Sequence, residues 1–156
     1  MNADLPIHAM PGYLVRRLHQ ISVSLFSDRV ASAGFDITQV QFAALNAAAA
    51  NPGLDQAGLA GLIAYDRVTI GGVVERLEQK GYLRREISPR DRRARALFVT
   101  EAGARVLDAL WPIVRELQGE ILAGLSEAEQ ATLVALLKKT TDAGNPLSRA
   151  PLTVPA

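Results

Sequence analysis

The chain has 156 residues, of which 49% are hydrophobic, so it can build the core of one domain of ordinary size. It has no cysteine, which excludes disulfides, thiolate nucleophiles and zinc–thiolate sites, and two histidines are too few to predict a metal site. The net charge is only +1, but residues 66–95 contain nine Lys/Arg against five Asp/Glu. A local excess of positive charge is typical of a surface that binds a polyanion.

The chain contains no apolar run of about 18 residues, the length that a membrane-spanning helix requires. Its start, MNADLPIHAMPG, lacks the basic-then-apolar order of a signal peptide. We therefore expect a cytoplasmic protein.

The first predicted helix covers residues 11–32, since Pro11 suits a first helical turn. Apolar residues follow at helical spacing on one side, namely Leu14, Leu18, Ile21 and Leu25. A second stripe, about half a turn away, contains Arg16, His19, Val23, Phe26 and Val30. We expect protein to cover this helix on two sides, and we expect the helix to end at Gly34.

Three shorter helices are predicted next. Thr38 and Gln41 have the spacing of a capping box, which opens the first of the three. Asp55 and Asp66 are then expected to cap two short helices joined by residues 64–65. Short helices with so tight a connection are typical of a helix-turn-helix, whose second helix is presented to a DNA groove.

A β-hairpin is predicted directly after this motif, with strands at residues 82–87 and 96–99. Thr100 and Ser126 then begin two amphipathic C-terminal helices. The apolar surface of the first and last helices exceeds what one small domain can cover, so we expect a second copy of the chain to cover it.

The predicted fold class is mainly α with a small β-hairpin wing (α+β), a winged helix-turn-helix flanked by N- and C-terminal dimerisation helices. The expected boundaries are 1–36 for the N-terminal helix, 37–100 for the DNA-binding domain, 101–143 for the C-terminal helices and 144–156 for a flexible tail.

The hairpin turn carries a cluster of arginines around one carboxylate, formed by Arg90, Asp91, Arg92, Arg93 and Arg95. Such a run is often no more than a solvated face. Beside a helix-turn-helix, however, guanidinium groups can pair with phosphates or enter a narrow minor groove. We interpret the cluster as the tip of a DNA-binding wing in which Asp91 orients a neighbouring arginine.

The second helix of the motif is expected to turn an apolar face inward and a mixed face toward DNA. The expected DNA contacts on this outward face are Arg67, Val68, Thr69, Gly71, Gly72 and Arg76. Two adjacent glycines are unusual, because each costs about 1 kcal/mol relative to alanine inside a helix. Either they pack closely against another helix, or they let the backbone approach DNA.

The stretch LAGLIAYDRVTIGGVVERLEQKGYLRREISPRDRRARALFVTEAG resembles the core of the multiple antibiotic resistance regulator (MarR) family of bacterial winged-helix transcription regulators. The family's wing signature, D-x-R-x-x-x-L-x-(L/V)-T, is matched by Asp91, Arg93, Leu97, Val99 and Thr100. The resemblance extends over almost all of residues 11–142. It implies a two-fold dimer formed by interlocking terminal helices.

The resemblance also implies roles for two arginines: Arg93 enters the minor groove and Arg76 contacts backbone phosphate. The sequence departs from the family at Gly71 and Gly72, where hydroxyl or long polar side chains are common. Base readout is therefore expected to depend more on residues 67–69.

Arg16 and Arg17 have two interpretations. In the first interpretation, both are surface residues. In the second, Arg16 faces protein, because it lies on the same helix stripe as Val23 and Phe26. A guanidinium that faces protein needs an anion as partner. Relatives with a similar P-G-x-L-x-R-R-L helix respond to aromatic carboxylates, so the resemblance implies that Arg16 binds such a carboxylate. The further residues expected around this ligand are His8, His19, Gln39, Phe42 and Asp66, although a helix cap explains Asp66 equally well.

The sequence thus predicts a ligand-responsive transcription regulator, in this family most often a repressor, that binds a pseudo-palindromic operator as a homodimer. Its expected effector is a small aromatic carboxylate or phenol. No enzyme, cofactor or metal is expected, because GxxxxGK[ST], HExxH and GxSxG are missing. The alternatives are a winged-helix module for protein–protein contacts and a regulator that responds to efflux-type drugs or oxidants.

Overall fold

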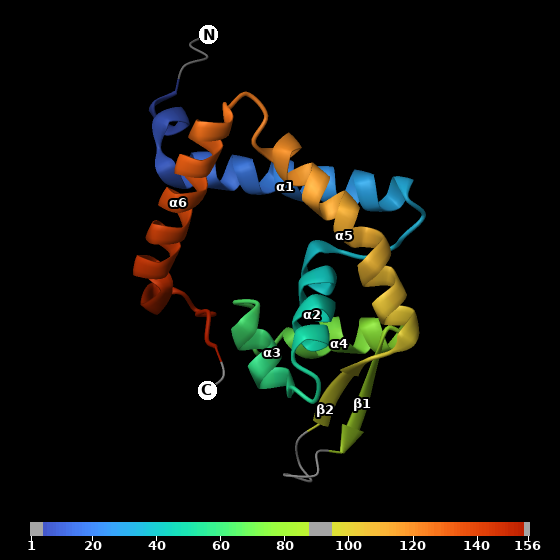
Figure 1. The fold of residues 1–156 in the computed structure, drawn as a ribbon. Helices are drawn as coiled ribbons and strands as arrows, with labels where there is room; N and C mark the ends of the chain where they lie inside the picture. Colours follow the sequence, from blue (N-terminus) through green and yellow to red (C-terminus); the bar gives the residue numbers. More distant parts are fainter. Residues whose placement is uncertain (1–4, 88–94, 155–156) are drawn as a thin grey trace.

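The computed structural model describes residues 5–87 and 95–154 (Figure 1). Its elements, in chain order, are η1 (Pro6–Ala9), α1 (Pro11–Ser32), α2 (Gln39–Ala50), α3 (Gln56–Leu62), α4 (Ile70–Gln79), β1 (Leu83–Ile87), β2 (Arg95–Val99), α5 (Glu101–Ile121), α6 (Glu127–Gly144) and η2 (Asn145–Leu147). The predicted fold class is confirmed: the chain is mainly helical, with one antiparallel hairpin.

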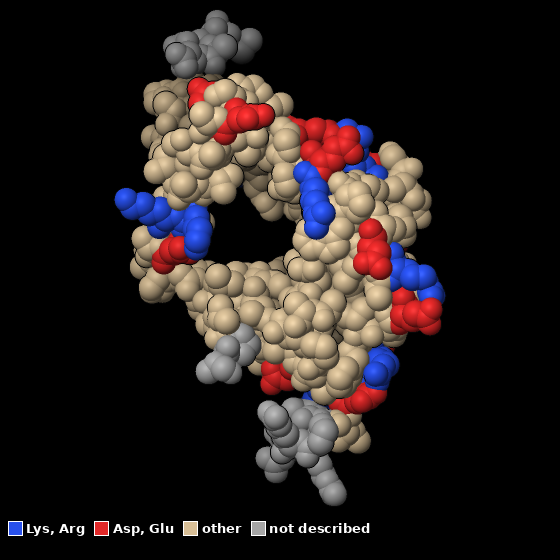
Figure 2. All heavy atoms as spheres, viewed as in Figure 1, with Lys and Arg blue, Asp and Glu red and all other residues tan. Residues whose placement is uncertain are grey.

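The elements form two groups in space. Helices α1, α5 and α6 form one group, and α2, α3, α4 and the hairpin form the other (Figure 1). Helix α5 connects the two groups because it packs along α1 and also against α2 and β2. The space-filling view shows an opening through the molecule between α6 and the second group, with uncharged atoms over most of its rim (Figure 2).

Side-chain caps explain where several helices begin. Thr38 Oγ1 accepts a hydrogen bond from the Gln41 N–H, and the Gln41 side chain accepts one from the Thr38 N–H, each at 3.2 Å. Ser126 and Glu129 form a second capping box. At α3, the Asp55 carboxylate accepts a bond from the Gly58 N–H at 2.7 Å. These caps satisfy donors that the first turn of a helix leaves free, and they confirm the predicted helix starts.

The hydrophobic core lies where α2, α3 and α4 meet the hairpin and α5. Its most deeply buried large side chains come from all of these elements, namely Leu45, Leu59, Leu77, Leu97 and Leu110. An aromatic group extends the core to α1: the Phe42 ring lies 6.0 Å from Phe26 and 5.4 Å from Trp111 between ring centroids. Phe42 therefore fastens α2 to both α1 and α5.

The hairpin is joined to the helices at its base. Leu97 forms a bridge with Leu54, accepting from the Gly53 N–H and donating to the Leu54 carbonyl, each at 2.9 Å. This isolated β-bridge could not be predicted from the sequence, because a single bridging residue shows no periodicity. At the other end, the Thr100 N–H donates to the Tyr82 carbonyl at 3.0 Å, so the hairpin is fixed to the start of α5.

Helix α6 contributes nothing to the core: none of its residues is buried in the single chain. Its Val134 and Leu136 are exposed, as are Leu14 and Ile21 on α1, although α1 does bury Phe26 and Val30. One side of α1 is therefore covered by the chain itself, and the other is open. No described helix is long and apolar enough to cross a membrane.

Two expectations differ from the structure. Asp66 does not cap α4, which begins at Ile70 after Thr69, so the connection between α3 and α4 runs over residues 63–69 rather than 64–65. The chain after α6 was expected to be a flexible tail. Instead, residues 145–154 continue through η2 and hydrogen-bond to α3.

Candidate nucleic-acid interface

Helix α4 has one buried and one exposed face, as its sequence predicts. Ile70, Val73, Val74 and Leu77 are all buried in the core. The opposite side is exposed at Gly72, Glu75 and Arg76, and the turn before the helix is exposed at residues 67–69. Val68 is 91% exposed, so this side chain has no packing role within the chain. The exposed face of α4 is therefore available to a partner.

Asp66 organises the turn that leads into α4. Its Oδ1 accepts a hydrogen bond from the Val68 N–H at 2.7 Å, and its carbonyl accepts one from the Thr69 hydroxyl at 3.2 Å. Hydrogen bonds of this kind are typical of an Asx turn. Asp66 thus holds the exposed residues 67–69 in shape, a role different from the helix cap that the sequence suggested, while its ligand contact stays a prediction.

The two glycines of α4 are not explained by close helix packing. A Cβ on Gly72 would meet no atom within 4 Å, and one on Gly71 would only touch the Gln56 side chain at 3.7 Å. Of the two interpretations that the sequence left open, close packing against another helix of this chain does not hold. The exposed surface of α4 is flat at this point, which leaves room for a groove wall to approach.

One ion pair joins the hairpin to α4. Arg85 on β1 donates to Glu78 at the end of α4, with Nε 2.9 Å and Nη2 2.5 Å from Oε2. The hydrogen bond from Arg85 lowers the pKa of the Glu78 carboxyl below its ordinary value, and the same bond raises the pKa of Arg85. This pair adds a contact between the end of α4 and β1.

The predicted arginine cluster lies mostly outside the described residues. Arg90, Asp91, Arg92 and Arg93 belong to the part of the chain that the structure does not describe, and their roles remain predictions. Arg95 is the first residue of β2 and is exposed. Arg84 on β1 also has an exposed side chain, and its guanidinium lies 4.8 Å from the centre of the Phe98 ring.

The residues predicted to bind an effector fall in separate places. Arg16 is exposed, donates to Gln20 at 3.1 Å, and lies 5.0 Å from the Tyr13 ring centre, which in turn is 5.3 Å from the His8 ring. The structure thus brings His8 and Arg16 together through Tyr13. The sequence left open whether Arg16 is a surface residue or faces protein, and in the single chain its side chain is exposed.

The other four candidates do not join this cluster through any described contact. His19 is exposed on α1. Gln39 donates to the carbonyl and the hydroxyl of Ser22, at 3.0 and 2.9 Å. Phe42 is 8% exposed and belongs to the aromatic core, and Asp66 belongs to the turn before α4. Tyr13 was not predicted as a site residue, although its spacing of three residues from Arg16 on a helix was an available signal.

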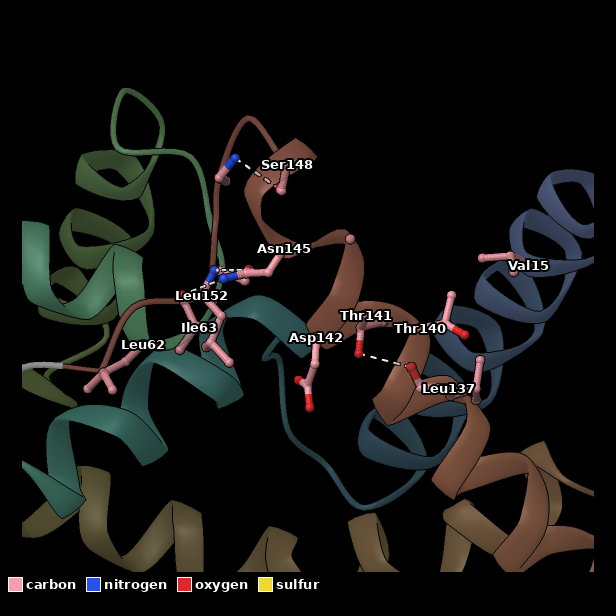
Figure 3. A pocket seen from close by; sticks show the side chains of 13 residues that line it. Val15, Leu62, Ile63, Leu137, Thr140, Thr141, Asp142, Asn145, Ser148 and Leu152 are labelled. Atoms are coloured by element: carbon pink, nitrogen blue, oxygen red, sulfur yellow. Dashed lines mark hydrogen bonds between the residues drawn. The ribbon is translucent and has the colours of Figure 1, made fainter.

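A cavity of about 870 Å³ lies between α1, the end of α3, α6 and the C-terminal segment (Figure 3). Its apolar walls include Val15, Ile63, Leu137 and Leu152. None of the six predicted effector residues lines it, although Val15 directly precedes Arg16. No group of three or more potential metal ligands occurs among the described residues.

The geometry defines a class of protein. A helix-turn-helix with an exposed second helix, a hairpin fixed beside it and arginines on the hairpin are the parts of a winged helix-turn-helix DNA-binding protein.

Comparison with known proteins identifies the family. The model of the MarR family matches residues 35–94. The HTH-type transcriptional repressor NicR of Pseudomonas putida is 30% identical over 141 residues, covering 90% of this chain and 88% of NicR. The PcaV transcriptional regulator of Streptomyces coelicolor, solved in complex with its natural ligand, is 35% identical with a TM-score of 0.81, covering 92% of this chain and 99% of PcaV.

A further solved structure is that of Bordetella bronchiseptica BpsR, whose DNA binding is regulated by 6-hydroxynicotinic acid. It is 26% identical with a TM-score of 0.82, covering 90% of this chain and 99% of BpsR. The chain belongs to the MarR family and is a transcriptional regulator.

Proposed function

We propose that this regulator is a repressor that binds a pseudo-palindromic operator as a homodimer, and that a small aromatic carboxylate or phenol modulates its DNA binding. The observation that carries the proposal is the exposed face of α4 beside the hairpin. An α-helix fits the major groove of B-DNA, and a flanking wing reaches the adjacent groove.

The DNA contacts of α4 follow from exposure and chemistry. Arg67 and Arg76 are exposed cations at the two ends of the helix face, suited to phosphates or guanine edges. Val68 and the open surface at Gly72 can accept the edge of a base pair, including a thymine methyl group. Thr69 and Gly71 lie between Val68 and Gly72 in the sequence and are proposed to contact the same groove. At the wing, Arg93 is proposed to enter the minor groove, with Asp91 orienting it and Arg90, Arg92 and Arg95 near phosphates.

A second copy of the chain is the proposed cover for the open apolar surfaces. Helix α6 has no buried residue, and Leu136 on this helix is 55% exposed. Propensity alone gives an 18-residue helix only marginal stability in water, and α6 buries no side chain that would add to it. Members of the MarR family bind DNA as dimers. A helix of the second copy can enter the apolar cavity bounded by Val15 and Leu137 (Figure 3).

Two-fold symmetry then fixes the form of the operator. Two identical recognition helices read two inverted half-sites, separated by about one turn of DNA, roughly 34 Å.

The effector is proposed to bind near Arg16. A guanidinium can pair with a carboxylate through two parallel hydrogen bonds, and Tyr13 places an aromatic face beside it. His8, which contacts Tyr13, would cover the ligand, whereas His19, Gln39, Phe42 and Asp66 are proposed to shape the site less directly. The regulation of BpsR by 6-hydroxynicotinic acid, an aromatic carboxylic acid, supports this class of effector, and PcaV also binds a ligand.

Fluorescence anisotropy with the duplex upstream of the protein's own gene tests the proposal. Tight binding at moderate salt, weakened by benzoate, 4-hydroxybenzoate or 6-hydroxynicotinate but not by cyclohexanecarboxylate or phenol, is the expected pattern for an aromatic carboxylate. Weakening by phenol alone would move the proposal to the phenolic class. Equal binding to unrelated DNA would refute specific recognition.

A further inference from the structure

The C-terminal segment, residues 145–154, is closed into a loop by one amide side chain. Asn145 accepts a hydrogen bond from the Leu152 N–H at 2.7 Å and donates one to the Leu152 carbonyl at 3.0 Å. The Asn145 side chain, at the end of α6, thus satisfies both the backbone N–H and the backbone carbonyl of Leu152 (Figure 3). The loop between them has a defined shape.

The end of this segment is seated on α3. The Thr153 N–H donates to the Gly61 carbonyl at 2.9 Å. A Cβ on Gly61 would lie 2.0 Å from Thr153 Oγ1 and 3.3 Å from its carbonyl oxygen, so any larger residue would force Thr153 to shift. The C-terminal segment therefore connects α6 to the helix-turn-helix and does not hang free from the molecule.

This path places a cation at the start of the recognition helix. Arg149 lies at the outer edge of the loop with its side chain 91% exposed, and its Nη2 is 3.5 Å from Asp66 Oδ2. Arg149 and Asp66 line one groove of about 360 Å³ together with Arg67 and Val68. Two arginines from distant parts of the sequence thus meet beside the exposed turn that leads into α4.

We propose that Arg149 is a DNA-contact residue, whose guanidinium binds a backbone phosphate at the edge of the major groove that α4 enters. The inference rests on the proposed function and extends the DNA-binding surface beyond the helix-turn-helix and wing. Arginine has five N–H donors, and the long contact with Asp66 leaves most of them available. Arg149 also offsets the negative charge of Asp66, which would otherwise repel a phosphate at this point.

The salt dependence of DNA binding tests this role. Each phosphate contact contributes about 0.9 to the slope of log affinity against log salt concentration, so Arg149→Ala in a dimer is expected to make the slope shallower by about 1.8. Arg149→Lys keeps the charge and is expected to retain most of the slope. The control is Arg105→Ala, which removes an exposed arginine paired with Glu101 on α5, and its slope should equal that of the unchanged protein.

The Asp66→Asn variant shows whether Arg149 contacts a phosphate or only pairs with Asp66. If Arg149 acts only by pairing with Asp66, both substitutions weaken binding alike and neither changes the slope, and this result would overturn the proposal. An unchanged slope for Arg149→Ala overturns it equally. If the unsubstituted protein shows no specific binding and no steep slope, the proposed function itself fails, so the two failures are distinguishable.

Discussion

Gly103→Ala should destabilise the protein and weaken DNA binding, although alanine is the better helix former. Gly103 lies in the first turn of α5, directly behind the hairpin. A Cβ at this position would lie 2.2 Å from the Tyr82 carbonyl oxygen and 2.9 Å from Val99 Cγ1. Contacts under 3.0 Å essentially never occur for real Cβ atoms, and the first obstacle is backbone rather than a flexible side chain. Either α5 or the hairpin must therefore move.

The magnitude follows from two opposing effects. Alanine gains about 0.5–1 kcal/mol in helix propensity. Forced overpacking costs about 1–3 kcal/mol, and a displaced Tyr82 carbonyl weakens its hydrogen bond with the Thr100 N–H, which contributes about 1 kcal/mol. We expect a net loss of about 1–3 kcal/mol in the free energy of unfolding.

Gly119→Ala on the same helix is the matched control. Gly119 is exposed, and a Cβ there would meet no atom within 4 Å. Only the propensity gain remains, so this variant should be more stable by about 0.5–1 kcal/mol. Urea denaturation at one fixed protein concentration measures both, and anisotropy measures operator affinity, which should fall only for Gly103→Ala. Equal stability of the two variants would refute the packing argument.

Four other predictions follow from particular contacts. Phe42→Ala should lower the free energy of unfolding by about 3–5 kcal/mol in urea, because it empties the aromatic core between Phe26 and Trp111; a loss below about 1 kcal/mol would contradict a core role. Glu78→Gln should cost less than about 1 kcal/mol at pH 7, because the pair is partly exposed. Arg85 holds the pKa of Glu78 below its ordinary value, so this contribution is present above the unfolded pKa and is lost as pH falls through the folded one. The Glu78→Gln variant and the unsubstituted protein should therefore have the same melting temperature in acid. A difference in melting temperature that grows as the pH falls would contradict the pairing of Glu78 with Arg85. Arg16→Ala should keep operator binding and lose the response to aromatic carboxylates, whereas unchanged ligand affinity in calorimetry would refute its role. Leu136→Glu should shift the protein to monomer in sedimentation, and a dimer of unchanged stability would exclude α6 from the interface.

Apolar periodicity and helix-capping residues were sufficient to predict the helices from the sequence. The apolar spacing of α4 predicted all four of its buried residues, and capping boxes at Thr38 and Ser126 marked two helix starts. These signals are local: each depends on residues within one or two turns, so tertiary packing does not override them.

The sequence was less informative wherever the structure depends on distant residues. The packing of Phe42 against Phe26 and Trp111 could not be predicted, because these residues are far apart in the sequence. Aspartate is a common helix-capping residue, so Asp66 was expected to cap α4. Ala64 has a left-handed backbone conformation and a turn follows it, so α4 begins only at Ile70. The contact of Thr153 with Gly61 joins residues far apart in sequence, and no periodicity could predict it.

We propose that two copies of this chain read two inverted half-sites on one face of DNA. Affinity for the upstream operator should therefore fall sharply when about 5 base pairs, half a helical turn, are inserted between the half-sites, and should largely return when about 10 are inserted. Analytical ultracentrifugation of the intact complex should show two chains per duplex. A single chain per duplex, or affinity that does not change with spacing, would refute recognition of the operator by a two-fold dimer.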